Sequence, residues 1–178
     1  MADGHVSENE ALRYRRLAFY SEDIDRFNEA LTTFNKKSSA RCVLLIDKDG
    51  HLVAKQGFMQ DMDSSALAAL VAGSFASTRE VARNLGESHF EVLFHQGQSQ
   101  SIHIRLVGDR TLQVAVFESS VKPGMIQVFT KELSGKVEEV LNAIAERQAN
   151  EPEDSGPELD AGFSEEMKSH LDDLFGDL

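Results

Sequence analysis

Few side chains in this sequence have the type and spacing needed for catalysis. The single cysteine, Cys42, lies inside the apolar run CVLLI, where a buried thiol behaves as a small hydrophobic group. There is no Gly-x-x-x-x-Gly-Lys-Ser/Thr loop for nucleotide phosphates and no Gly-x-Ser-x-Gly turn for a serine nucleophile. We therefore expect a protein that has no active site of its own.

Three histidines and one acidic turn are the candidates for a metal site. His89, His95 and His103 do not have the spacing of zinc ligands, and His103 is expected on the outer face of its strand. Residues 47–50, with the sequence DKDG, resemble the start of a calcium-binding loop but lack its twelve-residue frame and terminal glutamate. An Asp-Gly pair between two strand-like runs is typical of a β-hairpin. The sequence thus predicts a hairpin here, with no metal and no cofactor.

Two arginines on a predicted helix suggest a different chemistry. Arg79 and Arg83 are expected to face outward, so either could reach into a GTPase active site as an arginine finger. Outward-facing arginines are more often solvated or paired with a neighbouring acidic residue. The second interpretation is preferred here.

The acidic residues are concentrated at the C-terminal end of the chain. The 178 residues carry a formal net charge of −12, and residues 150–178 contain ten acidic residues and one lysine, which account for −9. This balance argues against nucleic acid and anionic membranes as partners and allows a basic protein partner. No apolar run is long enough to span a membrane and none at the N-terminus resembles a signal peptide, so a cytoplasmic protein is expected.

The most informative helix is predicted over residues 63–86, with Asp63 as its N-cap. At about 100° per residue, one apolar side is suited to cover a sheet; it comprises Leu67, Leu70, Val71, Ser74, Thr78, Val81, Ala82 and Leu85. The other side is a strip of small residues that continues into charge: Ala69, Ala72, Gly73, Ala76, Glu80 and Arg83. Glycine inside a helix costs roughly 1 kcal/mol relative to alanine, so Gly73 suggests close approach of another backbone. We interpret this side as a packing surface for a second chain; the alternative is a helix buried on both sides within one domain.

The remaining periodicities predict an α+β domain of the α/β class, with the order α-β-β-α-β-β-β-α. Helices are expected over residues 21–37, 63–86 and 122–144, the first capped by Ser21, and strands over residues 41–46, 51–57, 90–95, 101–107 and 111–118. The apolar stripe of the last helix is expected to be Met125, Val128, Phe129, Leu133, Val137, Val140, Leu141 and Ile144. A hairpin followed by a three-strand meander predicts a five-stranded, mostly antiparallel sheet.

The two ends of the chain differ in composition from this domain. Residues 1–18 are predicted to be a flexible N-terminus, residues 19–149 the domain and residues 150–162 an acidic linker rich in proline and glycine. Residues 163–178 form a predicted amphipathic helix whose apolar residues are Phe163, Met167, Leu171, Leu174, Phe175 and Leu178. Such a tethered segment is suited to dock in a groove, either on its own domain or on a partner.

Several of these segments resemble the Roadblock/dynein light chain superfamily. They are VLLIDKDGHLVAKQG with its Asp-x-x-Gly hairpin, LAALVAGSFASTREVARNLGE with its Ala-Gly centre, and HFEVLFHQG with the alternating strand that follows. The resemblance covers residues 24–144. The acidic linker and the terminal Leu-Asp-Asp-Leu-Phe segment are similar to the extension of bacterial members that regulate the Ras-like polarity GTPase MglA. The resemblance implies a Roadblock-like five-stranded sheet with helices on both faces.

The resemblance also implies a function. Such members form homodimers, bind an MglA-like GTPase and stimulate GTP hydrolysis by repositioning its switch regions, without an arginine finger. By position, the partner surface maps to Ala69, Ala72, Gly73, Ala76 and Glu80, together with the C-terminal residues Phe163, Met167, Leu171, Leu174 and Phe175. Phe75 is a bulky departure beside this strip. The implied place of action is the cytoplasm, with a cell pole as the site of concentration.

Two rival functions fit parts of the same pattern. One is a non-catalytic Roadblock scaffold that localises or sequesters a GTPase. The other is a small-molecule sensor of the PAS or GAF kind, which would need an internal cavity and would not present an outward strip of alanines.

Overall fold

The computed structural model describes residues 19–59 and 63–150, and these contain the predicted elements in the predicted order. The elements are α2 (Ser21–Ser38), β1 (Cys42–Asp47), β2 (Leu52–Gly57), α3 (Ser64–Asn84), β3 (Val92–Gln96), β4 (Gln100–Val107), β5 (Thr111–Glu118) and α4 (Pro123–Asn150). Residues 1–146 and 147–178 form two separate units, and the fold described here is that of the first. The predicted N-terminus, residues 1–18, and the predicted C-terminal helix, residues 163–178, lie outside the described residues. So does the predicted linker, residues 150–162, except for Asn150, which is the last residue of α4.

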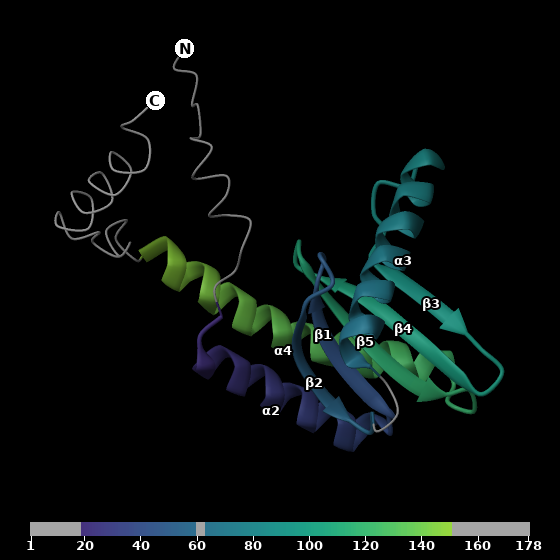
Figure 1. Ribbon diagram of the computed structural model, residues 1–178, viewed down its shortest axis with the longest axis horizontal. Coiled ribbons are helices and arrows are strands. Elements are labelled where there is room, and N and C mark those ends of the chain that lie inside the picture. Colours follow the sequence, from purple (N-terminus) through teal and green to yellow (C-terminus); the bar gives the residue numbers. More distant parts are fainter. Residues whose placement is uncertain (1–18, 60–62, 151–178) are drawn as a thin grey trace, which may run out of the picture. The chain divides into compact units, whose positions relative to one another are not determined.

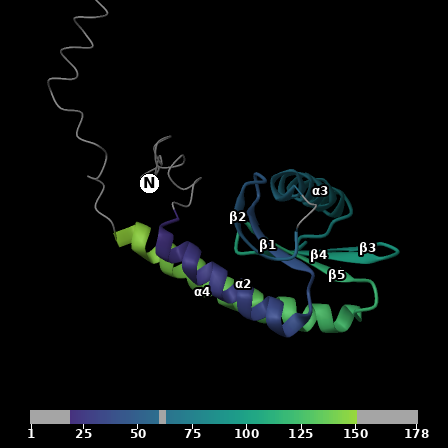
Figure 2. The ribbon, with the colours of Figure 1, turned by 60° about the horizontal axis from the view of Figure 1, so that its bottom comes forward.

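The five strands form one antiparallel sheet in the order β2-β1-β5-β4-β3. The β1–β2 hairpin and the β3–β4–β5 meander meet where β1 pairs with β5, so β1 lies between two neighbours. Helix α3 covers one face of the sheet, and α2 and α4 lie side by side on the other (Figures 1 and 2). The predicted mostly antiparallel sheet with helices on both faces is confirmed.

Strand β1 supplies both hydrophobic cores at once. Val43 and Leu45 join the core under α2 and α4, whereas Leu44 and Ile46 join the core under α3. All four side chains are fully buried. A continuous apolar run is what a strand covered on both faces requires, because alternate side chains point to opposite faces.

The helix starts follow local capping chemistry. The predicted N-cap Asp63 is confirmed, because its Oδ1 accepts hydrogen bonds from the backbone N–H groups of Ser65 (2.9 Å) and Ala66 (3.1 Å). The predicted cap at Ser21 is wrong by one residue. Tyr20 occupies the N-cap position, and Asp23 Oδ2 accepts from the Tyr20 N–H at 2.9 Å.

The predicted sheet-facing side of α3 is rotated from the observed one. The residues of α3 that are buried are Ser64, Ala68, Val71, Ala72, Phe75 and Ala82. Leu70, Val81 and Leu85, which were expected on the sheet, are exposed. The bulky Phe75 sets the phase, since it packs against Phe90 with ring centroids 5.3 Å apart.

At the start of α4, the buried side of the helix also differs from the predicted one. Met125 and Val128 are exposed, and Ile126, which the predicted stripe omitted, is fully buried. Polar side chains take up space under this helix. Gln113 on β5 donates to the carbonyl of Thr130 at 3.1 Å and accepts from the Ser134 hydroxyl at 3.1 Å. A periodicity count that tracks only apolar residues misses such a polar contact.

His103 on β4 lies in the core, so the predicted outward orientation is wrong. Its side chain is 1% exposed and faces Phe94 at a ring centroid distance of 6.4 Å. Within the described part of the chain, neither ring nitrogen has a hydrogen-bond partner. Burial, with the nearby Arg105 charge as a second cause, lowers the pKa of His103 to about 4, which keeps the ring neutral at physiological pH.

We predict that His103 makes the fold sensitive to acid. Because the pKa is about 4 in the folded state and 6.5 when exposed, only the unfolded chain binds a proton between these values. At about 1.4 kcal/mol per unit, this removes roughly 3 kcal/mol of stability as the pH falls from 6.5 to 4. His103→Leu should abolish this contribution in urea unfolding measured across that range, whereas His95→Leu, at an exposed position on β3, should keep the wild-type slope. If the unfolding free energies of His103→Leu and wild type fall equally with pH, His103 is not the source of the acid sensitivity.

Candidate functional site

The outward side of α3 presents a strip of small residues. Ala69, Gly73, Ala76 and Glu80 are all exposed, as the sequence predicted. Ala72 is the exception: its side chain is 6% exposed and packs on the sheet. None of the described residues covers the strip, and Ala72 does not belong to its exposed surface. The alternative interpretation of α3 as a helix buried on both sides is therefore wrong.

A second exposed surface runs along α3, and the sequence analysis missed it. Leu70, Val81 and Leu85 are 72%, 57% and 79% exposed, and they lie on one face of the helix. At 100° per residue, this apolar stripe lies about a third of a turn around the helix from the small-residue strip. The signal that could have revealed it is Phe75, because placing the largest side chain on the sheet turns these three residues to solvent.

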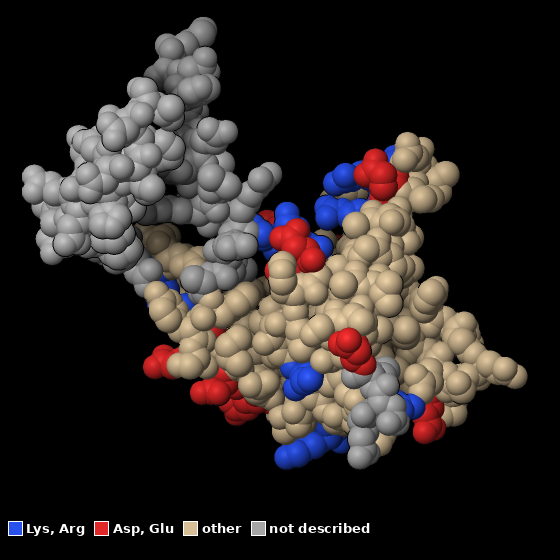
Figure 3. Space-filling view, viewed as in Figure 1, with Lys and Arg blue, Asp and Glu red and all other residues tan. Residues whose placement is uncertain are grey.

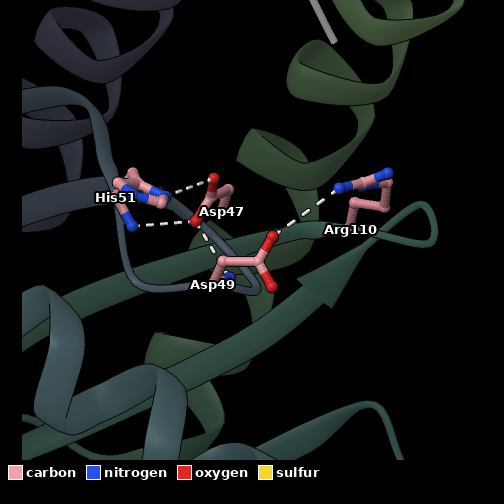
Figure 4. Close-up of polar contacts among 4 residues, drawn as sticks. All are labelled: Asp47, Asp49, His51 and Arg110. Atoms are coloured by element: carbon pink, nitrogen blue, oxygen red, sulfur yellow. Dashed lines mark hydrogen bonds and ion pairs between the residues drawn. The ribbon is translucent and has the colours of Figure 1, made fainter. Parts of the chain in front are cut away.

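The β1–β2 turn beside α3 is held rigidly by its own polar contacts (Figure 4). Asp47 Oδ1 accepts from the backbone N–H groups of Asp49 (2.9 Å) and His51 (2.8 Å), and Asp47 Oδ2 lies 3.0 Å from His51 Nδ1. The next turn along the sheet edge is joined to it, because the Lys48 N–H donates to the Arg110 carbonyl at 2.8 Å. Arg110 also lies 3.7 Å from an Asp49 carboxylate oxygen. The acidic residues of the DKDG run thus serve the turn.

This turn also sets the position of α3. Gly50 has φ +91°, a backbone conformation that side chains disfavour, and a Cβ there would lie 2.9 Å from Ala69 Cα. The close approach of the turn and the helix therefore requires glycine at residue 50. As a result, the hairpin braces α3 at the start of the small-residue strip.

The two arginines lie near the far end of this strip. Arg83 is exposed and its Nη1 lies 3.1 Å from Glu80 Oε2, whereas Arg79 is half-buried. In Figure 3, basic and acidic atoms lie together on the upper part of α3 and at the neighbouring end of the sheet. The other predicted partner residues, Phe163, Met167, Leu171, Leu174 and Phe175, lie outside the described residues.

Two further observations concern metals and membranes. Across residues 19–59 and 63–150, no group of three His, Cys, Asp or Glu side chains is arranged to hold a metal ion. No helix in the same ranges is both long and apolar enough to cross a bilayer.

Comparison with known proteins places this geometry in a family. The sequence model described as Roadblock/LC7 domain matches residues 26–117, which are 92 of the 178 residues. Among curated proteins, none matched the sequence.

Solved structures give a more specific likeness. Myxococcus xanthus MglB is 29% identical with a TM-score of 0.67, and the match covers 72% of this chain and 96% of that one. An MglB with a tetrameric arrangement is 27% identical with a TM-score of 0.67, and the match covers 72% of this chain and 96% of that one. The gliding protein MglB from Thermus thermophilus is 28% identical with a TM-score of 0.66, and the match covers 71% of this chain and 96% of that one. The MglB-like resemblance of the sequence is confirmed.

We predict that Gly73 is not required by the fold of the isolated chain. A Cβ at Gly73 meets nothing within 4 Å, and neither does one at Gly135 on α4. Because alanine is the better helix former, Gly73→Ala and the control Gly135→Ala should each raise the unfolding free energy by about 0.5–1 kcal/mol. Gly50→Ala should lower it. Urea unfolding tests all three, and a destabilised Gly73→Ala would show that the strip is already covered in the folded protein.

Proposed function

The chain belongs to the Roadblock/LC7 domain family, and from this premise we propose that it is a homodimeric GTPase-activating regulator of a Ras-like bacterial polarity or motility GTPase of the MglA kind. The observation that carries the proposal is the similarity to MglB structures over 96% of their length. Roadblock/LC7 is a regulatory domain family, so we propose that the chain acts on the catalysis of a partner.

The small-residue strip of α3, formed by Ala69, Gly73, Ala76 and Glu80, is the proposed GTPase surface. Small exposed side chains let a partner backbone approach closely, and the braced hairpin holds the helix in place for that contact. Gly73 supports the assignment, because it lowers helix propensity although a Cβ there would meet none of the described residues within 4 Å. The proposed C-terminal helix, residues 163–178, would add its apolar face to the GTPase.

The regulator would act by selecting a conformation of the GTPase. Binding more tightly to the arrangement of switch regions that is competent for hydrolysis increases its population. The coupling is reciprocal, so the GTP-bound partner should bind more tightly than the GDP-bound one. An arginine finger is not part of the proposal, because Arg83 already pairs with Glu80 and Arg79 is half-buried.

The apolar stripe of Leu70, Val81 and Leu85 is the proposed homodimer surface. Large apolar side chains exposed along one helix face favour association with a second copy of that face. Because the stripe and the small-residue strip lie on different sides of α3, a dimer could bind the GTPase without giving up its own contact.

We predict that Ala76→Arg abolishes stimulation of the GTPase while the protein stays folded. The side chain is exposed, so a long charged group there should clash with the partner and not with the core. Ala145→Arg, at an exposed helical alanine of α4, is the matched control. Single-turnover GTP hydrolysis with an MglA-like GTPase measures the effect, with circular dichroism as the check of folding.

The same assay distinguishes the rival mechanisms. Binding without acceleration by the wild type would favour the scaffold. A loss on the order of 10³-fold or more in Arg79→Ala or Arg83→Ala at saturating regulator would reveal an arginine finger and overturn the proposed mechanism. Normal acceleration by folded Ala76→Arg would exclude the small-residue strip as the GTPase surface.

We also predict a dimer in solution that depends on Val81. Light scattering at micromolar concentration should give about twice the monomer mass. Val81→Glu should shift the protein towards the monomer mass, because it places a charge in the apolar stripe. Val128→Glu changes another exposed helical valine, on α4, and should leave the dimer intact. A wild-type monomer, or equal dimerisation of both variants, would contradict this surface.

A further inference from the structure

A basic hollow lies between the second half of α3 and the two turns at the end of the sheet, and no function is yet assigned to it. Its volume is about 270 Å³. Its apolar floor is made by Ala72, Phe75, Leu106 and Leu112, and its charged residues are Lys48, Arg79, Arg83, Glu80 and Asp109. We call this feature the α3 cleft. Its wall includes Ala76, so it adjoins the small-residue strip.

The cations of the α3 cleft are not all neutralised within the chain. Arg83 pairs with Glu80 at 3.1 Å. In contrast, within residues 19–59 and 63–150, neither the Lys48 ammonium nor the Arg79 guanidinium forms a hydrogen bond or ion pair. The cleft therefore offers two available cations above an apolar floor.

The fold fixes the backbone positions from which these two cations extend. Lys48 stands in the turn whose backbone is bonded to Asp47 and Arg110, and Arg79 stands on α3, which that turn braces through Gly50. A half-buried arginine also loses less conformational freedom on binding than a fully exposed one. Such preorganisation favours a specific ligand over diffuse attraction.

The other hollow provides a contrast. It lies between α2 and α4 with a volume of about 320 Å³, and its charged residues are Arg26, Lys37, Lys136, Glu29, Glu132 and Glu139. Three cations face three anions there, with Lys37 paired to Glu132 at 2.8 Å and Lys136 to Glu139 at 3.6 Å. The positive and negative charges of that hollow are equal in number. Of the two hollows, therefore, only the α3 cleft has an excess of cations for an anionic ligand.

We propose that the α3 cleft receives an acidic side chain, next to a large apolar one, from the GTPase that docks on the small-residue strip. This inference rests on the proposed function and names the chemistry of the partner at that surface. A carboxylate suits the site because the arginine fork can bind it with two parallel hydrogen bonds and Lys48 adds a point charge. The apolar floor accepts the neighbouring side chain. Glu80 and Asp109 on the rim disfavour a more highly charged phosphate group.

The inference is tested by association kinetics with an MglA-like GTPase, using the full-length chain. Arg79→Glu and Lys48→Glu should each lower the association rate constant roughly tenfold at low salt, and the difference should shrink above about 0.1 M salt, where the Debye length is near 10 Å. Arg26→Glu, in the balanced hollow, has the same change in net charge and should remain close to wild type. Arg79→Lys should keep the wild-type association rate constant, but its complex with the GTPase should dissociate faster, since lysine lacks the planar guanidinium fork.

A second measurement decides the inference without the GTPase. The peptide Ac-Leu-Glu-Phe-Asp-NH2 should shift the NMR amide signals of Lys48 and Arg79, and its Gln/Asn counterpart should not. Equal GTPase rates for Arg79→Glu and Arg26→Glu, or equal shifts with both peptides, would overturn the inference. A specific response to inorganic phosphate at constant ionic strength would overturn it in favour of a phosphate ligand. If the GTPase does not bind the wild type, the proposed function fails, and the peptide result still decides what the cleft binds.

Discussion

The burial of β1 on both faces is the constraint on which the rest of the structure depends. Its alternate side chains supply two separate cores, so neither face can lose its helices without exposing half of the strand. Burying one such aliphatic side chain contributes about 1.5–3 kcal/mol. Because β1 also pairs with both β2 and β5, it joins the hairpin to the meander and determines where each helix can pack.

The same strand leads directly into the surface assigned to the partner. The turn that follows β1 is fastened by Asp47, and Gly50 allows it to lie against α3 at Ala69. The core thereby fixes the helix, and the helix can present different chemistry on its two outward sides. One side has small residues beside a basic cleft, and the other has large apolar residues. The proposed GTPase surface and the proposed dimer surface can therefore lie on one element, since side chains a third of a turn apart need not touch the same molecule.

The element order and sheet class could be predicted because they rest on local signals. The Asp-Gly turn, the Asp63 cap and the position of strand β4 each follow from signals over a few residues and are confirmed. Helix phase was harder to predict, since α3 carries apolar residues on more than one side and hydrophobicity alone does not say which side meets the sheet. Phe75 decides it by packing against Phe90, a contact that requires the fold. His103 was missed for a similar reason, because a polar residue in an alternating strand looks outward unless the strand is covered on both faces.

In the candidate site, too, features within one element could be predicted and features built from several segments could not. The small-residue strip was visible in the sequence because its members lie at helical spacing within one element, and only Ala72 was misplaced. The α3 cleft was not visible, since Lys48, Arg79 and Asp109 come from three separate segments that only the sheet brings together. This difference bears on how such a protein can act. A regulator without catalytic groups affects its partner only through the difference in its affinity for two conformations of that partner. Affinity of that kind needs rigid, composite surfaces, and a turn braced against a helix provides one.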